Sequence, residues 1–300
     1  MDDLVNNPPH IPVMIEDVLN YLCLKPGQII LDGTVGSGGH ASKIIEKVQP
    51  NGLLIGIDKD LQILYIAKEY LSKISNTICK FYHADYSDVD EVLRQAGVDK
   101  VHGVLLDLGA SSLQFDWAER GFSFSKEGPL DMRMDRSRGV TVHDLIQRLS
   151  EKELEELLKK YGEERWSRRI ARAILRAEKE TGIISTRQLA AIIERIVPIG
   201  KSKIHPATRT FQALRIAVNR ELDSLGNFLD KIHHYMFAGA RIVIISFHSL
   251  EDRIVKNKFI EKANQGIFKI LTKKPISPGE AEIEKNIRSR SAKLRAAERI

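Results

Sequence analysis

The segment Asp32–Gly39 constrains the fold of this chain most strongly, because it joins a short apolar run to an amphipathic stretch. Four of the seven residues from Gly33 to Gly39 are glycine. Glycine lets the backbone approach a ligand where a side chain would clash, and the start of a helix adds positive potential. The segment predicts a strand, a ligand-binding turn and a helix in succession. The alternative is a glycine-rich tight turn that binds nothing.

Apolar runs and helical patterns alternate through the first third of the chain. The predicted strands are Gln28–Leu31, Leu53–Ile57, Ile78–His83 and Val101–Leu108. The stretches with helical spacing are His40–Val48, Leu61–Ile74 and Val89–Ala96. Such alternation with short turns is typical of an α/β fold, in which a parallel sheet is covered by helices on both faces.

A helical region interrupts this alternation. The chain from Val142 to about Val197 has helical patterns only, and Ser150 with Glu153 forms a capping box at the start of one of them. Thr208–Ile232 is predicted as one long amphipathic helix. The absence of a strand pattern between Val142 and Val197 predicts a small helical domain inserted into the α/β domain.

The strand pattern returns near the C-terminus. Arg241–Phe247 predicts a further strand of the core sheet, and Gly266–Leu271 predicts a final one. Glu282–Ile300 is charged, and we expect an arm or an irregular surface segment there.

The net charge of +6 is unevenly distributed along the chain. Residues 126–220 hold 21 Lys and Arg against 13 Asp and Glu, whereas residues 1–125 hold 10 against 17. A basic middle on an acidic front half predicts a polyanionic partner, and the alternative is a solvated helical surface.

Nothing in the sequence predicts export or membrane insertion. The chain has no apolar run of about 18 residues, which a membrane span requires, and no signal pattern after Met1. Cys23 and Cys79 are too few for a disulfide framework or a zinc site. We therefore expect a soluble cytoplasmic protein without a membrane contact.

Polar residues follow the predicted strands where a doubly wound sheet binds its ligand. Asp58 ends the second strand, about twenty residues after the glycine turn, where a carboxylate can accept from both ribose hydroxyls. Tyr86 follows the third strand and can pack on an adenine, and Asp107 ends the fourth. The convergence predicts a nucleoside cofactor. Helix capping by Asp58 and ordinary packing of Tyr86 are the alternatives.

The glycine spacing does not favour a dinucleotide. The G-x-G-x-x-G fingerprint fails from Gly33, because its third position is Val35, and from Gly36 it ends on Ala41. His248, after the predicted strand Arg241–Phe247, is a further candidate at the same edge of the sheet, although a structural histidine is the simpler interpretation.

Six separated motifs resemble the RsmH (MraW) family of bacterial methyltransferases. They are Asp32–His40, Leu106–Gln114, Glu119–Phe124, Gly128–Asp135, Ala207–Arg215 and Ser246–Arg253. The resemblance runs from His10 to Arg295. It implies a Rossmann-like class I methyltransferase sheet with an inserted all-helical domain. It also implies transfer of a methyl group from S-adenosyl-L-methionine to the exocyclic N4 of a cytidine in 16S ribosomal RNA of the small subunit.

The resemblance and the motifs together predict domains and cofactor contacts. Residues 1–125 and 208–300 are expected to form the discontinuous methyltransferase domain, and residues 126–207 the inserted RNA-recognition domain. The expected cofactor-binding residues are Gly36, Gly38, Gly39, His40, Asp58, Tyr86, Asp107 and Gln114. Relatives have phenylalanine at the position of Tyr86, so the aromatic ring is kept and a hydroxyl is added.

The proton acceptor for the target amine is less defined. Related amino-methyltransferases carry a proline-rich tetrapeptide after the fourth strand, and Asp107-Leu108-Gly109-Ala110 lacks it. We expect Asp107 or a group near Ser111 to take this role, with no metal ion required, although Asp107 could serve only the cofactor.

RNA contacts are predicted from charge and position. Arg165, Arg168, Arg169, Arg172 and Arg176 recur at helical spacing as a candidate phosphate-binding stripe, which nearby glutamates could neutralise. Further candidates are Lys201, Lys203, Arg209, His248, Ser249 and Arg288–Arg295. Two other classes of function stay open here, a nicotinamide oxidoreductase and a non-catalytic RNA-binding or assembly protein.

Overall fold

The computed structural model describes residues 11–74, 78–198 and 204–300, and the chain divides into two compact units. Unit 1 comprises Met1–Gly109 with Leu222–Ile300, and unit 2 comprises Ala110–Glu221. Buried apolar side chains form two clusters in unit 1 and a third in unit 2, so each unit has its own core. No helix in the described part of the chain is long and apolar enough to cross a membrane.

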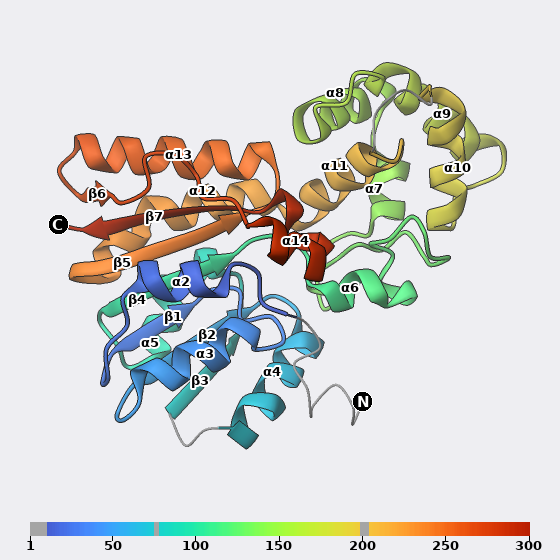
Figure 1. The fold of residues 1–300 in the computed structure, drawn as a ribbon. Coiled ribbons are helices and arrows are strands. Elements are labelled where there is room, and N and C mark those ends of the chain that lie inside the picture. The colour runs from blue at the N-terminus through green and yellow to red at the C-terminus, as the bar shows by residue number, and fades with distance from the viewer. Residues whose placement is uncertain (1–10, 75–77, 199–203) are drawn as a thin grey trace. The chain divides into compact units, whose positions relative to one another are not determined.

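A single sheet forms the centre of unit 1 (Figure 1). In the described residues its strand order is β3-β2-β1-β4-β5-β7-β6. The strands are β1 (Ile29–Asp32), β2 (Leu53–Asp58), β3 (Ile78–His83), β4 (Val101–Asp107), β5 (Met236–Ser246), β6 (Phe268–Ile270) and β7 (Lys293–Arg299). β1 to β5 are parallel, and β7 is antiparallel to both of its neighbours. The Rossmann-like α/β fold is therefore confirmed. The order reverses between β1 and β4, where such sheets bind ligands.

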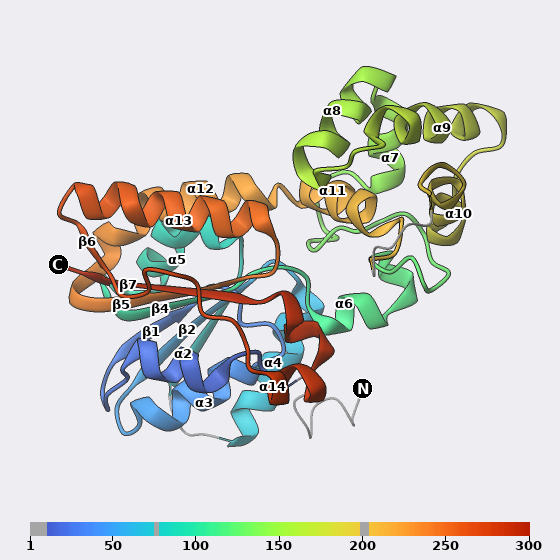
Figure 2. The ribbon, with the colours of Figure 1, turned by 45° about the horizontal axis from the view of Figure 1, so that its top comes forward.

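Helices cover both faces of this sheet (Figure 2). One face carries α2 (Ile15–Leu22), α3 (Gly39–Val48) and α4 (Leu61–Ile74); the other carries α5 (Val89–Ala96), α12 (Glu221–Lys231) and α13 (Ser249–Asn264). Ile30 and Leu31 are adjacent in β1 but pack in opposite clusters, because successive strand residues point to opposite faces. Burial on both faces explains why β1 is apolar without alternation. Shorter elements of unit 1 are η1 (Tyr86–Asp88), η3 (Ile232–Tyr235), α14 (Glu280–Lys285) and η4 (Ile287–Ser291).

The C-terminal segment enters the sheet, so the expectation of an arm over Glu282–Ile300 is wrong. β7 lies between β5 and β6, with Leu294, Ala296 and Ala297 fully buried. Its charged residues suggested exposure, but Arg295 is buried and its guanidinium binds the carboxylate of Asp252 at 2.6 and 3.2 Å. The predicted final strand at Gly266–Leu271 corresponds to β6, at the edge of the sheet.

The predicted helix Thr208–Ile232 is also wrong, because it consists of two helices. α11 (Thr208–Asn219) ends at Arg220, whose φ of 52° is left-handed, and α12 follows. Apolar spacing continues across the break, so periodicity alone did not reveal it. α11 packs on α8 in unit 2, so the second boundary between the units lies after Glu221 and not after residue 207. The first boundary lies after Gly109 and not after residue 125.

Unit 2 contains helices without a strand among its described residues. They are α6 (Ser112–Asp116), η2 (Ala118–Arg120), α7 (Val142–Arg148), α8 (Glu151–Gly162), α9 (Ser167–Glu180), α10 (Thr186–Ile196) and α11. The predicted capping box of Ser150 and Glu153 is confirmed at the start of α8, where Ser150 Oγ accepts from the Glu153 N–H. Apolar residues on one side of each helix from α7 to α11 form the core of this unit.

Candidate functional site

Unit 1 places the predicted acidic residues at the carboxyl ends of neighbouring strands. Asp32, Asp58 and Asp107 are the last residues of β1, β2 and β4, and Tyr86 begins η1 after β3. In the sheet register, Asp32 lies opposite Gly56 of β2 and Leu105 of β4. The order of the strands therefore brings these side chains to one edge of the sheet, at the reversal where a ligand is expected.

The glycine turn is fixed to the second strand. The backbone N–H of Gly36 donates to Asp58 Oδ2 at 2.9 Å, and the N–H of Val35 donates to the carbonyl of Ile57 at 2.9 Å. Gly36 and Gly38 have φ values of 55° and 94°, a region that other residues rarely adopt. α3 begins directly after this turn, so its first backbone N–H groups lie beside it and favour an anionic or hydroxyl ligand.

Asp58 is held as a hydrogen-bond acceptor. Its Oδ1 accepts from the Asp60 N–H at 2.8 Å, while its Oδ2 accepts from Gly36. A carboxylate has about four acceptor positions, so two remain for a ligand such as a ribose diol. Burial raises the pKa of Asp58 to about 6, and the two N–H donors oppose that rise.

Tyr86 follows β3, the strand that pairs with β2, and its aromatic ring is held in place. The ring is buried and packs edge to face on Phe228, with centroids 5.6 Å apart and an interplanar angle of 85°. The preceding Asp85 accepts from Lys59 Nζ at 2.5 Å and from Ser224 Oγ at 2.7 Å. These contacts immobilise the turn after β3, which suits a ring that packs on a planar ligand.

Two carboxylate oxygens at the β1/β4 reversal have no hydrogen-bond partner among the described residues. They are Oδ2 of Asp32 and Oδ1 of Asp107, and both are buried. Asp32 Oδ1 accepts from the Thr34 N–H at 3.1 Å, and Thr34 Oγ1 accepts from the Asp107 N–H at 2.6 Å. Burial raises the pKa of each carboxyl to about 7. Asp32 was missed in the sequence, although it is the last strand residue before the glycine turn.

His40 lies between this carboxylate pair and the N-terminal segment. Its Nε2 is 2.8 Å from the carbonyl oxygen of Val13, and its Nδ1 is 3.6 Å from Asp107 Oδ2. The side chain is buried, and burial lowers its pKa. Both ring nitrogens therefore face protein atoms, so a cofactor contact at His40 would come from its backbone at the start of α3.

These residues fit S-adenosyl-L-methionine. Buried carboxylate oxygens without a donor are costly unless a ligand neutralises them, and the cofactor carries a sulfonium and an ammonium group. Asp58 offers acceptors for ribose hydroxyls, and Tyr86 offers an aromatic face. When bound, the cofactor supplies an electrophilic methyl group.

Ser111 and Gln114 belong to unit 2 and are bound to each other. The Ser111 N–H donates to Gln114 Oε1 at 2.9 Å, which forms a capping box at the start of α6. Arg209 also has a structural partner, since its Nη1 donates to the carbonyl of Glu163 at the end of α8, 3.1 Å away. Their predicted roles toward cofactor or RNA stay predictions.

His248 and Ser249 begin α13 in unit 1. His248 is its N-cap, with Nδ1 accepting from the Glu251 N–H at 3.3 Å. Its Nε2 lies 3.1 Å from Glu251 Oε1 but makes no hydrogen bond to the described residues. The N-cap bond at Nδ1 supports the simpler interpretation of a structural histidine. A contact with RNA at these two residues stays a prediction.

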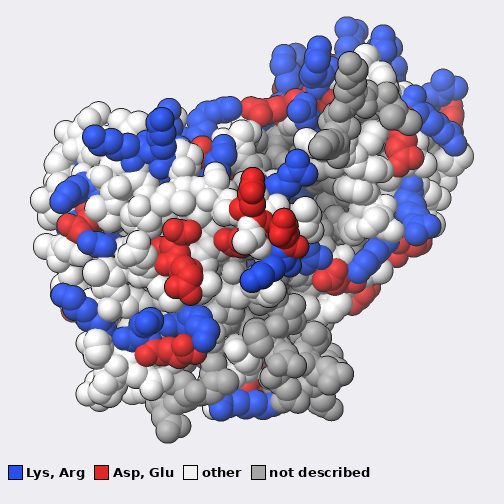
Figure 3. All heavy atoms as spheres, viewed as in Figure 1, with Lys and Arg blue, Asp and Glu red and all other residues white. Residues whose placement is uncertain are grey.

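The arginines of α9 differ in their partners. Arg172 pairs with Glu151 at 3.2 Å and Arg176 pairs with Glu180 at 2.8 Å. Within the described chain, no carboxylate lies within ion-pair distance of Arg165, Arg168 or Arg169, and Arg169 lies over the Trp166 ring at 4.9 Å. Figure 3 shows basic side chains gathered over α8 and α9. Lys201 and Lys203 lie outside the described residues.

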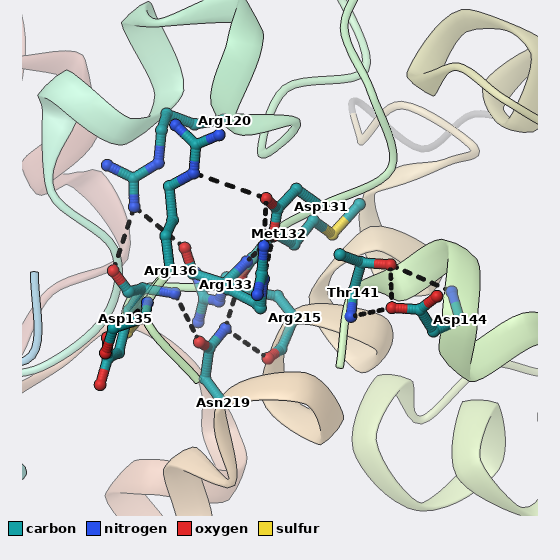
Figure 4. Close-up of polar contacts among 12 residues, drawn as sticks. Arg120, Asp131, Met132, Arg133, Asp135, Arg136, Thr141, Asp144, Arg215 and Asn219 are labelled. Carbon is teal, nitrogen blue, oxygen red and sulfur yellow. Dashed lines mark hydrogen bonds and ion pairs between the residues drawn. The ribbon is translucent and has the colours of Figure 1, made fainter. Parts of the chain in front are cut away.

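The motif Gly128–Asp135 is held by buried polar side chains (Figure 4). Arg120, which is 1% exposed, donates from Nη2 to the carbonyls of Arg133 and Met134 at 2.9 and 3.1 Å. Asn219 Oδ1 accepts from the Met134 N–H at 2.7 Å, and its Nδ2 donates to the Met132 carbonyl at 2.8 Å. No local sequence pattern pointed to Asn219, because its partners lie more than 80 residues away.

A doubly wound sheet with a glycine turn and these three acids defines a class of proteins that bind a nucleoside cofactor. The chain belongs to the MraW methylase family, whose model matches residues 7–300. A relative from Caldicellulosiruptor saccharolyticus, named ribosomal RNA small subunit methyltransferase H, is 45% identical over 97% of this chain and 99% of its own. The relative of the same name from Pelobacter propionicus is 47% identical over 97% of this chain and 98% of its own. An rRNA methylase structure from Streptococcus thermophilus matches with a TM-score of 0.45 at 11% identity, over 96% of this chain and 95% of that one.

The burial of Asp32 predicts a specific dependence of stability on pH. Because the folded-state pKa is raised from 3.8 to about 7, the folded protein binds the proton more tightly, and stability falls as the pH rises through this window. Asp32→Asn removes the ionisation. The unfolding free energy of the variant minus that of the unsubstituted protein, measured with urea, should therefore rise by roughly 2–3 kcal/mol from pH 5 to pH 8. Asp99→Asn, at an exposed position, should show no such gain, and an equal response of the two variants would show that burial of Asp32 is not the cause.

Proposed function

We propose that this chain transfers a methyl group from S-adenosyl-L-methionine to the exocyclic N4 of a cytidine in 16S ribosomal RNA. The observation that carries the proposal is the match over 97% of the chain to relatives named for methylation of small-subunit ribosomal RNA. The substrate would be the RNA within the small ribosomal subunit, in the cytoplasm where subunits assemble. Because the sulfonium is already an electrophile, the proposal includes no metal ion.

The cofactor is assigned to the carboxyl edge of the sheet in unit 1. Asp58 would accept from the ribose hydroxyls, and Tyr86 would pack on the adenine. Gly36, Gly38 and Gly39 would bring the backbone close to it at the start of α3. The unpartnered oxygens of Asp32 and Asp107 would face its positive charge. Gln114 is assigned to the cofactor by family resemblance alone.

Asp107 is assigned a second role as proton acceptor. The amine of cytosine is a weak nucleophile because its lone pair is delocalised into the ring, so removal of a proton as the new bond forms assists the reaction. Burial raises the pKa of Asp107 to about 7, close to the working pH of a cytoplasmic enzyme. Oδ1 has no partner among the described residues, so it is available to accept this proton. Ser111 is the alternative.

RNA recognition is assigned to unit 2 because of its charge. Unit 2 holds 22 Lys and Arg against 16 Asp and Glu, whereas unit 1 holds 24 of each. The net charge of +6 therefore belongs to unit 2 alone. Within it, Arg165, Arg168 and Arg169 are the best candidates for phosphate, because the other arginines of the stripe already have carboxylate partners. The target base must leave its stack for the chemistry, so a grip on the backbone is needed.

The activity is tested with small subunits that lack the modification. The protein should transfer labelled methyl from S-adenosyl-L-methionine to 16S ribosomal RNA, and digestion should yield N4-methylcytidine. Asp107→Asn should lower kcat by about 10²-fold or more, the usual contribution of a general base. A different methylated nucleoside would overturn the substrate assignment, and binding without transfer would favour a non-catalytic RNA-binding protein.

Two variants test the proposed RNA-binding surface, one with three substitutions at arginines that have no carboxylate partner in the described chain and one with two substitutions at paired arginines. Arg165→Glu with Arg168→Glu and Arg169→Glu should weaken RNA binding and reduce the slope of log Kd against log salt by about two to three units. Arg172→Glu with Arg176→Glu removes arginines that are already paired, and it should change the slope less per residue. Filter binding at several salt concentrations measures both. Equal slopes in the two variants would contradict the assignment.

A further inference from the structure

His40 is fixed in one tautomer by its contact with the N-terminal segment. The carbonyl oxygen of Val13 only accepts hydrogen bonds, so the 2.8 Å contact requires a proton on Nε2 of His40. A neutral imidazole then has a lone pair on Nδ1. The contact with Val13 therefore leaves a lone pair, and not a proton, on Nδ1 of the neutral ring.

That lone pair faces a carboxylate. Nδ1 lies 3.6 Å from Asp107 Oδ2, and two acceptors at this separation repel each other unless a proton lies between them. The distance is longer than a good hydrogen bond, but such contacts often shorten when a site is loaded. The Asp107 N–H donates to Thr34 Oγ1, and this hydrogen bond fixes the backbone of Asp107.

We propose that His40 is a positioning residue that shares one proton with Asp107 and receives it when Asp107 accepts the proton of the target amine. This inference rests on the proposed function for the identity of the base. It adds a role for the side chain of His40, whereas the cofactor contact expected there needs only the backbone.

Asp107 gains one proton at Oδ1 and loses one proton from Oδ2 in this transfer. Before the reaction the shared proton is on Oδ2, and Oδ1 has no partner among the described residues. As the amine nitrogen gains its methyl group, one of its protons moves to Oδ1 and the Oδ2 proton moves to Nδ1 of His40. Asp107 ends with one proton, as it began, and His40 ends as imidazolium. The positive charge brought by the cofactor is then on the ring.

Burial is the largest influence on both groups, and it lowers the pKa of His40 and raises the pKa of Asp107. The carboxylates near the ring oppose the effect of burial on His40. His40 is influenced by Asp32 from β1 and by Glu282 from α14, and both carboxylates favour its protonated form. Asp107 is influenced by Glu251 from α13, which disfavours its ionised form and so keeps the shared proton in place before the reaction. The proton transfer converts a neutral pair into a neutral Asp107 and a charged His40, and the coulombic influence of Asp32 and Glu282 offsets part of the cost of that buried charge.

The first test observes the shared proton without any cofactor. In protein labelled with ¹⁵N-histidine, the Nδ1 resonance of His40, assigned with His40→Gln, should move with pH near 7 together with the titration of Asp107. Asp107→Asn should abolish this movement and leave His40 as the Nε2–H tautomer at pH 8. Identical titration of Nδ1 in the two proteins would overturn the proposal.

The second test separates positioning from folding. His40→Gln keeps a donor for the Val13 carbonyl but removes the basic nitrogen, so kcat should fall about 10²-fold and the pH profile should change, with cofactor affinity within about threefold. His143→Gln in unit 2 is the matched control, because the ring of His143 also contacts a backbone carbonyl, that of Ile183 at 3.1 Å, and its kcat should be unchanged.

The two tests distinguish failure of this inference from failure of the proposed function. A wild-type kcat and pH profile in His40→Gln, with Asp107→Asn inactive, would overturn the proton sharing and leave Asp107 as the base. A fully active Asp107→Asn would instead overturn the proposed role of Asp107, and the proton sharing would fall with it. Loss of cofactor binding in His40→Gln in step with kcat would show a structural role and overturn the inference.

Discussion

Asp32 and Asp107 hold two buried carboxylate oxygens at the reversal of the strand order, and no donor among the described residues satisfies them. Burying such groups destabilises a folded protein, since an unsatisfied acceptor costs about 1–3 kcal/mol and a charge costs more. The arrangement is understandable if the missing partner is a ligand. A cation at this edge would satisfy both oxygens, and the surrounding turn, ribose acceptor and aromatic ring fit the rest of a nucleoside cofactor.

In the proposed mechanism the same carboxylates connect binding with catalysis. A methyl group leaves a positively charged sulfur, so the reaction needs both a place for that charge before transfer and an acceptor for a proton afterwards. Asp107 can serve both purposes because its backbone is fixed by Thr34 and its pKa is close to neutrality. The overall charge of unit 1 is zero and the basic excess lies in unit 2, so the chemistry and the attraction of a polyanion are assigned to different parts of the chain.

Local patterns predicted most of unit 1. The strands from β1 to β4 and the helices between them agree with the expected ranges within one residue, because periodicity and glycine turns are properties of neighbouring residues. The positions of Asp58, Tyr86 and Asp107 followed from strand ends. β7 was missed because the ion pair that hides Arg295 joins it to Asp252, more than 40 residues away. The break at Arg220 and the role of Asn219 depend on how α11 packs, which no local pattern reveals.

The buried carboxylate of Asp32, whose Oδ2 has no partner among the described residues, is the group that a cationic cofactor would neutralise, while Asp107 keeps the proton that it shares with His40. Calorimetric titration near pH 7 in buffers of different ionisation enthalpy measures this directly, because a cation favours the ionised form of Asp32 and releases the proton that burial retains there. Binding of S-adenosyl-L-methionine should release more protons than binding of its demethylated product, whose sulfur is neutral, and the difference should disappear in Asp32→Asn. Equal proton release for the two ligands would contradict the account.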